Sequence, residues 1–528
     1  MIETALGLRG GFTAPHRVAT KVGADVLDAG GSAIEAMVAA AATIAVVYPH
    51  MNGIGGDGFW LIHRKDQAPV AISACGPAAG LATPDWYAKQ GYATSIPARG
   101  ALAALTVPGT VSGWQAALEL VDATRRMPLA DLLGPAIALA KDGVAVTRNQ
   151  SVTTAEKIDG LRDVPGFADI YLARGAAPVP GTILKQDALG DTLATIAANG
   201  PESFYRGDVA RAHARFLEQQ GSPLRLADFD SYVAELQLPL TVTTSHGQLF
   251  NMGPPTQGMS ALAILGVFDR LGVTEGEGFD HLHGLVEATK QAFIIRNAEL
   301  GDPNAMRAPA QDFLTDTEFD RMAAAIDRKT ALPWPHVAKQ GDTIWMGAAD
   351  RDGTVVSFIQ SVFWEFGSGL TCPETGVVFQ NRGAGFSLSE GPNRLAPGRR
   401  PFHTLNPALA VLDDGRVMAY GTMGGEGQPQ TQAAVFTRHV QFGMPLQQAV
   451  SAPRWLLGKT WGDNTTSLKL EESFDPALVE GLRAAGHEVE LTPAFSSLMG
   501  HAGAIVRHPD GRLEAASDPR SDGLGYAV

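Results

Sequence analysis

The residue best suited to nucleophilic attack stands where the character of the sequence changes. Thr343 follows Gly341 and Asp342, at the point where helical periodicity gives way to short β-branched runs. A threonine hydroxyl needs a base before it can attack an amide carbonyl. If the peptide bond before Thr343 is cut, its own α-amino group, with a reference pKa of roughly 7.7 to 8, can be that base. The position therefore predicts a nucleophile that becomes active at a new chain end.

A pair of glycines downstream has the chemistry of an oxyanion hole. Gly424 and Gly425 are adjacent in the strand-rich part of the chain. Their backbone N–H groups can approach a developing negative charge closely, because no side chain stands in the way. We therefore expect these two amides to stabilise the tetrahedral species that Thr343 would form.

Several other catalytic patterns are missing from the sequence. It has no GxSxG elbow, no HExxH, no GxxxxGK[ST] loop and no EF-hand loop. The glycine-rich stretch 53–58 follows a predicted helix and lacks a lysine, so we interpret it as a structural turn. His281 and His283 lack a third ligand, so we interpret them as capping or packing residues. Cys75 and Cys372 are interpreted as small buried apolar residues rather than nucleophiles.

The elements that must position these residues are helices in the first part of the chain and a mixture after residue 343. Apolar periodicity predicts helices over 18–27, 33–47 (capped by Ser32), 112–120 and 281–300, a strand over 59–63, and a mainly helical region from 125 to 300. Later strands are predicted over 343–349, 354–362, 377–379, 408–412, 417–420, 488–491 and 504–508, the last two being the final strands, with helices over 430–442 and 476–485. This mixture predicts a layered α/β/β/α fold.

Composition and charge argue against nucleic acid and membranes as partners. The chain has 528 residues and a formal net charge of −14, and no stretch supplies the basic patch that a nucleic-acid partner requires. Its longest apolar run, 36–47, is shorter than the ~20 residues of a membrane span. The N-terminus lacks a basic region followed by an apolar core. We expect a soluble cytoplasmic protein that binds neither nucleic acid nor membrane.

Motifs along the whole chain resemble the γ-glutamyltransferase (γ-glutamyl transpeptidase) family of N-terminal-nucleophile hydrolases. They occur in the family's order at 30–36, 49–59, 107–114, 204–208, 300–303, 350–353 and 424–425. The resemblance implies an inactive precursor that cleaves itself between Asp342 and Thr343 by an N→O acyl shift. The products would be a large subunit, 1–342, and a small subunit, 343–528, which together form a four-layer αββα sandwich with a helix-rich extension in the large subunit.

The resemblance also assigns roles to the catalytic residues. Thr343 would be the nucleophile, Gly424 and Gly425 would bind the oxyanion, and Ser361 would orient the nucleophile in place of a family threonine. The mechanism needs no metal and no organic cofactor, because Thr343 supplies both nucleophile and base.

The substrate-binding positions depart from the family pattern. Ser73 stands where the family binds the glutamate α-carboxylate with an arginine, and Gly385 stands where it binds the α-amino group with an aspartate. His403 and Thr404 replace a serine pair that also binds the carboxylate, and Phe363 replaces an asparagine. These replacements predict that a zwitterionic amino acid is not bound in the family's usual way.

The same comparison introduces a new positive charge. Arg382 replaces a family glutamine and follows Asn381. A guanidinium can bind a plain carboxylate bidentately. We therefore expect Arg382, together with Asn381, His403, Thr404 and Phe363, to bind a small anionic amide.

These patterns resemble a divergent branch of the family that includes oxamate amidohydrolase of bacterial purine breakdown and several acylases. The predicted reaction is hydrolysis of oxamate with release of ammonia. Three alternatives stay open: a γ-glutamyl hydrolase or transferase acting on glutathione, a glutaryl-type side-chain acylase, and an unprocessed scaffold protein. The segment 386–397 is shorter than the lid of many relatives. Large and small subunits are expected to associate as (αβ)2.

Overall fold

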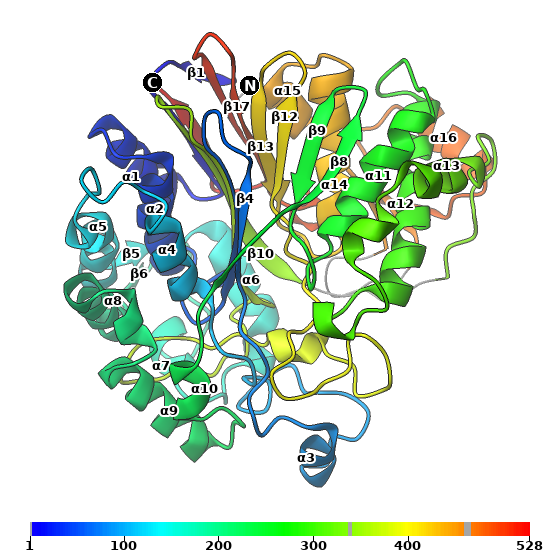
Figure 1. The fold of residues 1–528 in the computed structure, drawn as a ribbon. Coiled ribbons are helices and arrows are strands. Elements are labelled where there is room, and N and C mark those ends of the chain that lie inside the picture. The colour runs from blue at the N-terminus through cyan, green and yellow to red at the C-terminus, as the bar shows by residue number, and fades with distance from the viewer. Residues whose placement is uncertain (1–2, 336–340, 459–465) are drawn as a thin grey trace.

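The computed structural model describes residues 3–335, 341–458 and 466–528. Within them, two sheets of seven strands each lie face to face, and helices cover both outer faces (Figure 1). This is the αββα arrangement that the sequence predicts.

The first sheet carries Thr343. Its strand order is β19-β2-β10-β11-β3-β4-β7, and every neighbouring pair is antiparallel. The strands are β2 (Gly10–Ala14), β3 (Asp57–His63), β4 (Val70–Ala74), β7 (Glu235–Gln237), β10 (Asp342–Asp350), β11 (Val355–Phe363) and β19 (Leu524–Ala527).

The second sheet leads to the paired glycines. Its order is β1-β18-β17-β13-β12-β9-β8, again with antiparallel neighbours. The strands are β1 (Ala5–Gly7), β8 (Leu240–Thr244), β9 (Gly247–Asn251), β12 (Ala408–Leu412), β13 (Val417–Thr422), β17 (Ala502–Arg507) and β18 (Leu513–Ser517). Both sheets mix strands from before and after Thr343, so the two parts of the chain are intertwined.

Helices of the first half cover the first sheet. Helix α2 (Ala33–Val47) is buried along its whole length and packs on β10 and β11, which explains its almost entirely apolar sequence, rich in alanine. Ser32 and Glu35 form a capping box at its start. The other helices on this side and in the helix-rich extension are α1 (Arg17–Asp28), α3 (Pro84–Lys89), α4 (Thr110–Leu118), α5 (Leu129–Asp142), α6 (Arg148–Lys157), α7 (Phe167–Tyr171), α8 (Asp187–Asn199), α9 (Asp208–Gln220) and α10 (Leu226–Asp230).

The second sheet is covered by helices from both halves of the chain. Helix α11 (Gly258–Arg270) packs on β8 and β9, α14 (Gly427–Phe436) packs on β13, and α12 (Phe279–Glu299) lies over α11 and α14 (Figure 1). The remaining helices are α13 (Asp316–Ala324), α15 (Leu446–Ser451) and α16 (Pro476–Ala484). Smaller sheets contain β5 (Val144–Ala145) with β6 (Ile183–Leu184), and β14 (Trp455–Leu457) with β15 (Leu468–Glu471) and β16 (Val489–Thr492).

Three apolar cores separate the layers. One lies between α2 and the first sheet, one between the second sheet and α11, α12 and α14, and one between the two sheets. The core between the sheets includes Trp345 and Ile359 from the β10–β11 hairpin and Leu409 from the facing sheet. The start of β10 is thus held between packed layers on both sides.

Several predicted elements differ from the structure. Residues 377–379 form no strand beyond an isolated bridge at Val378, and the region 125–300 contains three strands between 235 and 251. Residues 488–491 and 504–508 do not mark the last strands, because β18 and β19 follow them. The predicted helix 430–442 ends as α14 at Phe436, followed by a π-helical turn. The remaining predicted helices and strands match observed elements to within two residues at each end. No helix in the described parts of the chain has the length and apolarity to cross a membrane.

Candidate active site

Thr343 lies at a break in the pairing of β10 with β11. Asp342 pairs with Phe363 and Ile344 pairs with Gln360, so the register shifts between them. One residue of β10 then faces two residues of β11, which is the pattern of a β-bulge. Thr343 is that residue, and its side chain is fully buried. The extra residue of this bulge is on β11, so Thr343 faces both Ser361 and Val362 and has no single partner in the regular ladder.

Ser361 occupies the facing strand. Its Oγ accepts a hydrogen bond from the Phe363 amide at 2.7 Å, and Ser361 itself pairs with Asp57 on β3. Phe363 has a φ of +84°, a left-handed conformation that a bulky residue rarely adopts. The hydroxyl thus helps to hold a strained turn beside Thr343.

Gly424 and Gly425 form the turn between β13 and α14. Their φ values are +116° and +53°, in the region that favours glycine. The Gly427 amide donates to the Gly424 carbonyl at 2.8 Å, and the Gln428 amide donates to the Gly425 carbonyl at 3.3 Å. The turn therefore precedes the N-terminus of α14, where the helix dipole favours negative charge.

Gly341 shows how closely these parts approach each other. A Cβ added to Gly341 would lie 2.8 Å from the Thr404 Oγ1, 3.3 Å from the Gly425 Cα and 3.4 Å from a ring carbon of Phe363. The chain just before Thr343 is therefore packed against three of the predicted site residues.

Arg382 is buried behind Phe363. Its guanidinium carbon lies 3.8 Å from the centre of the Phe363 ring, and none of its three side-chain nitrogens has a hydrogen-bond partner among the described residues. Burial lowers the pKa of Arg382 to about 9, although the nearby Asp57 carboxylate raises it. An unpaired guanidinium in this position is costly, and an anion that reached it would remove that cost.

Asp57 is the acidic neighbour of this guanidinium. Its Oδ1 accepts hydrogen bonds from the Gly76 and Gly109 amides, both at 3.2 Å, and from Gln380 Nε2 at 3.0 Å. Burial raises the pKa of Asp57 to about 7, while Arg382 and these hydrogen bonds lower it. The sequence reasoning missed Asp57 because it read the stretch 53–58 only as a turn. A carboxylate among glycines at the start of a buried strand was the available signal.

His403 completes this buried group. Its Nε2 lies 3.3 Å from Asp57 Oδ2, an approach whose geometry does not form a hydrogen bond. Burial, followed by the charges of Arg382 and Arg400, holds the pKa of His403 well below its usual value. The imidazole is therefore neutral, and its ring packs edge-on against Phe59.

A cavity of about 460 Å³ opens beside these residues. None of its lining side chains in the described chain is charged; the lining residues are Thr94, Ser95, Ile96, Phe363, Trp364, Ala384, Gly385, Phe386, Ser387, Leu388, Asn393, Phe402 and Thr404. Asn393 ties two walls together, since its Nδ2 donates to the Gly385 carbonyl and its Oδ1 accepts from the Phe402 amide. The short segment 386–397 thus lines the cavity.

The predicted substrate residues do not all face this cavity. Phe363 and Thr404 line it, and the Thr404 Oγ1 is buried without a hydrogen-bond partner in the described chain. Asn381 is committed to the backbone, since it accepts from the Trp364 amide at 3.0 Å and donates to the Ala98 carbonyl at 2.8 Å. Arg382 and His403 lie outside the lining.

A larger groove of about 740 Å³ lies elsewhere, between α6 and the segments 495–498 and 519–522. None of the predicted site residues lines it.

Cys75 and Cys372 are buried as predicted, and burial raises the pKa of the Cys75 thiol to about 12, so this thiol is not a nucleophile at neutral pH.

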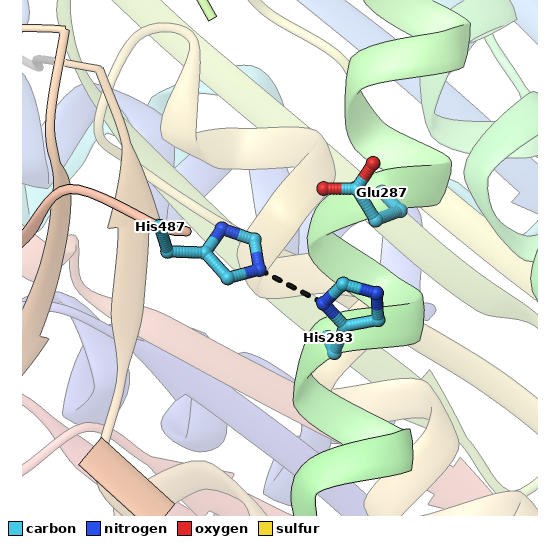
Figure 2. A group of neighbouring side chains, drawn as sticks. All are labelled: His283, Glu287 and His487. Atoms are coloured by element: carbon cyan, nitrogen blue, oxygen red, sulfur yellow. Dashed lines mark hydrogen bonds between the residues drawn. The ribbon is translucent and has the colours of Figure 1, made fainter. Parts of the chain in front are cut away.

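One group of side chains has the composition of a metal site. His283 and Glu287 on α12 and His487 after α16 bring their ligand atoms within 4.8 Å of one another (Figure 2). His283 Nδ1 is 2.9 Å from His487 Nε2, and His283 Nε2 donates to the Asp327 carbonyl. Glu287 already binds the Lys290 ammonium at 2.7 Å. This network of satisfied groups joins α12 to the C-terminal part of the chain and gives no reason to assign a metal.

Comparisons with known proteins identify the family of the chain. The gamma-glutamyltranspeptidase family model matches residues 19–528. The oxamate amidohydrolase proenzyme of Klebsiella pneumoniae is 52% identical over all of both chains, and the glutathione hydrolase-like YwrD proenzyme of Bacillus subtilis is 38% identical over all of both. The crystal structure of cephalosporin acylase from Bacillus halodurans superimposes with a TM-score of 0.92 at 29% identity, covering 100% of this chain and 97% of that one. The chain therefore belongs to the gamma-glutamyltranspeptidase family and is an N-terminal-nucleophile amidohydrolase.

Proposed function

We propose that this protein is a proenzyme that cleaves itself between Asp342 and Thr343 and then hydrolyses a small anionic amide, with oxamate as its substrate. We infer an anionic substrate from the guanidinium of Arg382, which is buried behind Phe363 and has no hydrogen-bond partner among the described residues. The 52% identity to an oxamate amidohydrolase proenzyme supports the choice of oxamate.

Self-cleavage begins with the Thr343 hydroxyl. Its oxygen attacks the Asp342 carbonyl, the C–N bond breaks, and the acyl group moves to the hydroxyl as an ester. Water then hydrolyses this ester, which leaves a carboxylate on Asp342 and a free amine on Thr343. The bulge supports this step, because it interrupts the regular β10–β11 pairing next to the bond to be cut.

Turnover uses the same hydroxyl with the new amine as its base. The amine takes the hydroxyl proton as the oxygen attacks the amide carbon of the substrate. The amides of Gly424 and Gly425 stabilise the oxyanion, and the leaving nitrogen takes the proton and departs as ammonia. Water attacks the resulting ester and releases oxalate, so that oxamate and water give oxalate and ammonia. Ser361 orients the Thr343 hydroxyl.

The carboxylate of the substrate binds Arg382. A charge-assisted hydrogen bond of this type contributes ~1.5–3 kcal/mol. In the continuous chain the Phe363 ring lies over the guanidinium, so the carboxylate reaches it when this ring moves aside. Asp57 lies next to the arginine and favours its charged form, and Thr404 offers a hydroxyl to the substrate from the cavity wall. We propose that His403 and Asn381 hold Arg382, Asp57 and Thr404 in position and do not contact the substrate.

The positions expected to bind the α-carboxylate and the α-amino group of a γ-glutamyl substrate lack charged side chains, which argues against glutathione as the substrate. Ser73 is buried and approaches Cys75 at 3.5 Å, and Gly385 presents no carboxylate to an amino group. Association of the fragments as (αβ)2, a cytoplasmic location and a place in purine degradation stay predictions of this proposal.

Assays with defined amides test the substrate. The purified protein is incubated with oxamate or with a γ-glutamyl anilide, and oxalate, ammonia and aniline are measured. We expect oxalate and ammonia in equal amounts from oxamate and no aniline from the anilide. Release of aniline without turnover of oxamate would contradict the proposal.

A second candidate is an acylase that acts on a larger side-chain amide. The observation that favours it is the cavity of about 460 Å³, whose walls include Ile96, Trp364 and Leu388 and which exceeds the size of oxamate. A glutaryl anilide added to the same assay separates the two candidates, because only the acylase would hydrolyse it faster than oxamate.

A further inference from the structure

Gln257 connects two loops of the candidate site. This side chain is fully buried just before α11, in the part of the chain that precedes Thr343. Its Nε2 donates to the Thr404 carbonyl at 2.6 Å and to the Gly425 carbonyl at 2.8 Å. One amide group therefore holds the glycine turn and the wall that carries Thr404.

Arg296 fixes the orientation of that amide. Its Nη1 donates to Gln257 Oε1 at 3.0 Å. A guanidinium can only donate, so the Gln257 oxygen must face Arg296 and both hydrogens of its NH2 group must face the two carbonyls. This contact removes the ambiguity of the amide's two orientations.

Glu426 joins the same group from within the glycine turn. Its carboxylate lies 3.0 Å from Arg296 Nη2, and both side chains are almost entirely buried. Arg296 also lies over the Phe293 ring, with its guanidinium carbon 3.7 Å from the ring centre. The residue directly after Gly425 is thus held by the same guanidinium that orients Gln257.

These contacts hold the Gly424–Gly425 turn in place. Gly424 and Gly425 have no side chains to anchor them, and glycine adopts many backbone conformations readily, so contacts from other residues must hold this turn in one conformation. The Gly425 carbonyl belongs to the peptide unit that follows the proposed oxyanion amides, and the Glu426 side chain is attached to the next Cα. Holding that unit fixes the direction in which the amides point.

We propose that Gln257, held by Arg296, is a positioning residue that aligns the Gly424–Gly425 amides with Thr343. Glu426 completes the unit. This inference rests on the proposed function, since it concerns the same reaction. It means that the fragment before Thr343 supplies the support for the catalytic turn of the fragment after it.

The test compares two glutamines with equivalent hydrogen bonds. Gln447 is also buried, and its amide donates to the Ser517 carbonyl at 2.7 Å and accepts from the Ser517 amide at 3.1 Å, away from the glycine turn. Gln257→Ala and Gln447→Ala are prepared as full chains, and kcat and KM are measured on the substrate that the wild type hydrolyses fastest. We expect Gln257→Ala to lower kcat about 10- to 100-fold with KM within about twofold, because misalignment acts in the transition state. We expect Gln447→Ala to keep the wild-type kcat.

Arg296→Lys provides a second variant if Gln257→Ala does not fold. A lysine keeps the positive charge but cannot bridge Gln257 and Glu426 with separate nitrogens of a planar fork. Its kcat should fall below that of Gln447→Ala, again with little change in KM. A Gln257→Ala chain that folds but stays uncut also supports the proposal, because the cleaved bond lies beside the same Gly425.

The outcomes distinguish the inference from the proposed function. If the wild type hydrolyses no amide, the proposed function fails. If the wild type is active and both Gln257→Ala and Arg296→Lys keep the kcat of Gln447→Ala, the positioning role fails while the proposed function stands. A rise in KM at constant kcat would likewise overturn the role.

Discussion

The guanidinium of Arg382 lies 3.8 Å from the ring of Phe363, and this aromatic side chain separates the arginine from the cavity. The family resemblance implies an amide side chain at both positions in enzymes that bind γ-glutamyl groups. A cation over an aromatic face is stabilised by the ring quadrupole, but this interaction does not replace hydrogen bonds. Arg382 can therefore exchange its contact with the Phe363 ring for hydrogen bonds to a carboxylate when substrate binds.

Replacing this arginine tests the proposed carboxylate contact. Arg382→Ala should raise KM for oxamate about 10- to 100-fold, which corresponds to ~1.5–3 kcal/mol of lost binding. The neutral diamide oxamide should show no such change, since it has no carboxylate. Steady-state kinetics with both substrates on the cleaved variant measure the effect. Equal changes for oxamate and oxamide would return Arg382 to a purely structural role.

The glycine turn can be tested by adding one methyl group. Gly425→Ala should lower kcat about 10²- to 10³-fold with little effect on KM, as expected when an oxyanion donor is displaced. The φ of +53° lets alanine occupy the position at a cost of ~1–2 kcal/mol, so the chain should still fold. Circular dichroism establishes folding before the kinetics are read. A variant with normal kcat and raised KM would show that these amides bind the ground state.

The carboxyl of Asp57 should make stability depend on pH. Burial raises its pKa from an ordinary value of 3.8 to about 7, so between these two pH values the folded chain binds a proton that the unfolded chain releases. Stability from this group is therefore greatest below about pH 4 and falls as the pH rises towards 7.

Asp57→Asn is the matched variant for this effect. The asparagine keeps an acceptor for the Gly76 and Gly109 amides but does not titrate in this range. Melting temperatures of both proteins are compared from pH 4 to pH 8. The wild type should lose stability relative to the variant as the pH rises, and parallel curves would contradict the raised pKa.

The sequence predicts the local parts of the molecule well. Ser32 and the apolar run after it predict both ends of α2, because the capping residue and the buried residues are neighbours in the sequence. The β10–β11 hairpin follows from β-branched runs around a polar turn. Strand β8 alternates buried and exposed residues, which is the pattern of a strand, although the surrounding region 125–300 has mainly helical periodicity.

The long-range contacts of the site could not be predicted. Asp57 meets Arg382 because the segment 380–382 folds back onto the end of β11, where Ser361 pairs with Asp57, and the Asn381 amide donates to the Val362 carbonyl. Gln257 meets Gly425 because the chain before α11 crosses to the glycine turn. Neither pair is marked by spacing along the sequence, since the folding of loops back onto the ends of strands and helices decides which residues meet. The burial of Arg382 was also hidden, because arginine is usually exposed.

The central claim is that Thr343 becomes the first residue of a new chain. Intact-mass measurement of the purified protein under denaturing conditions tests it directly, with Thr343→Ala as the control. The wild type should give two species that correspond to residues 1–342 and 343–528, and the variant should give one species of about 55.5 kDa. A wild type that stays in one piece after long incubation, or a Thr343→Ala chain that is cut at the same bond, would contradict the account.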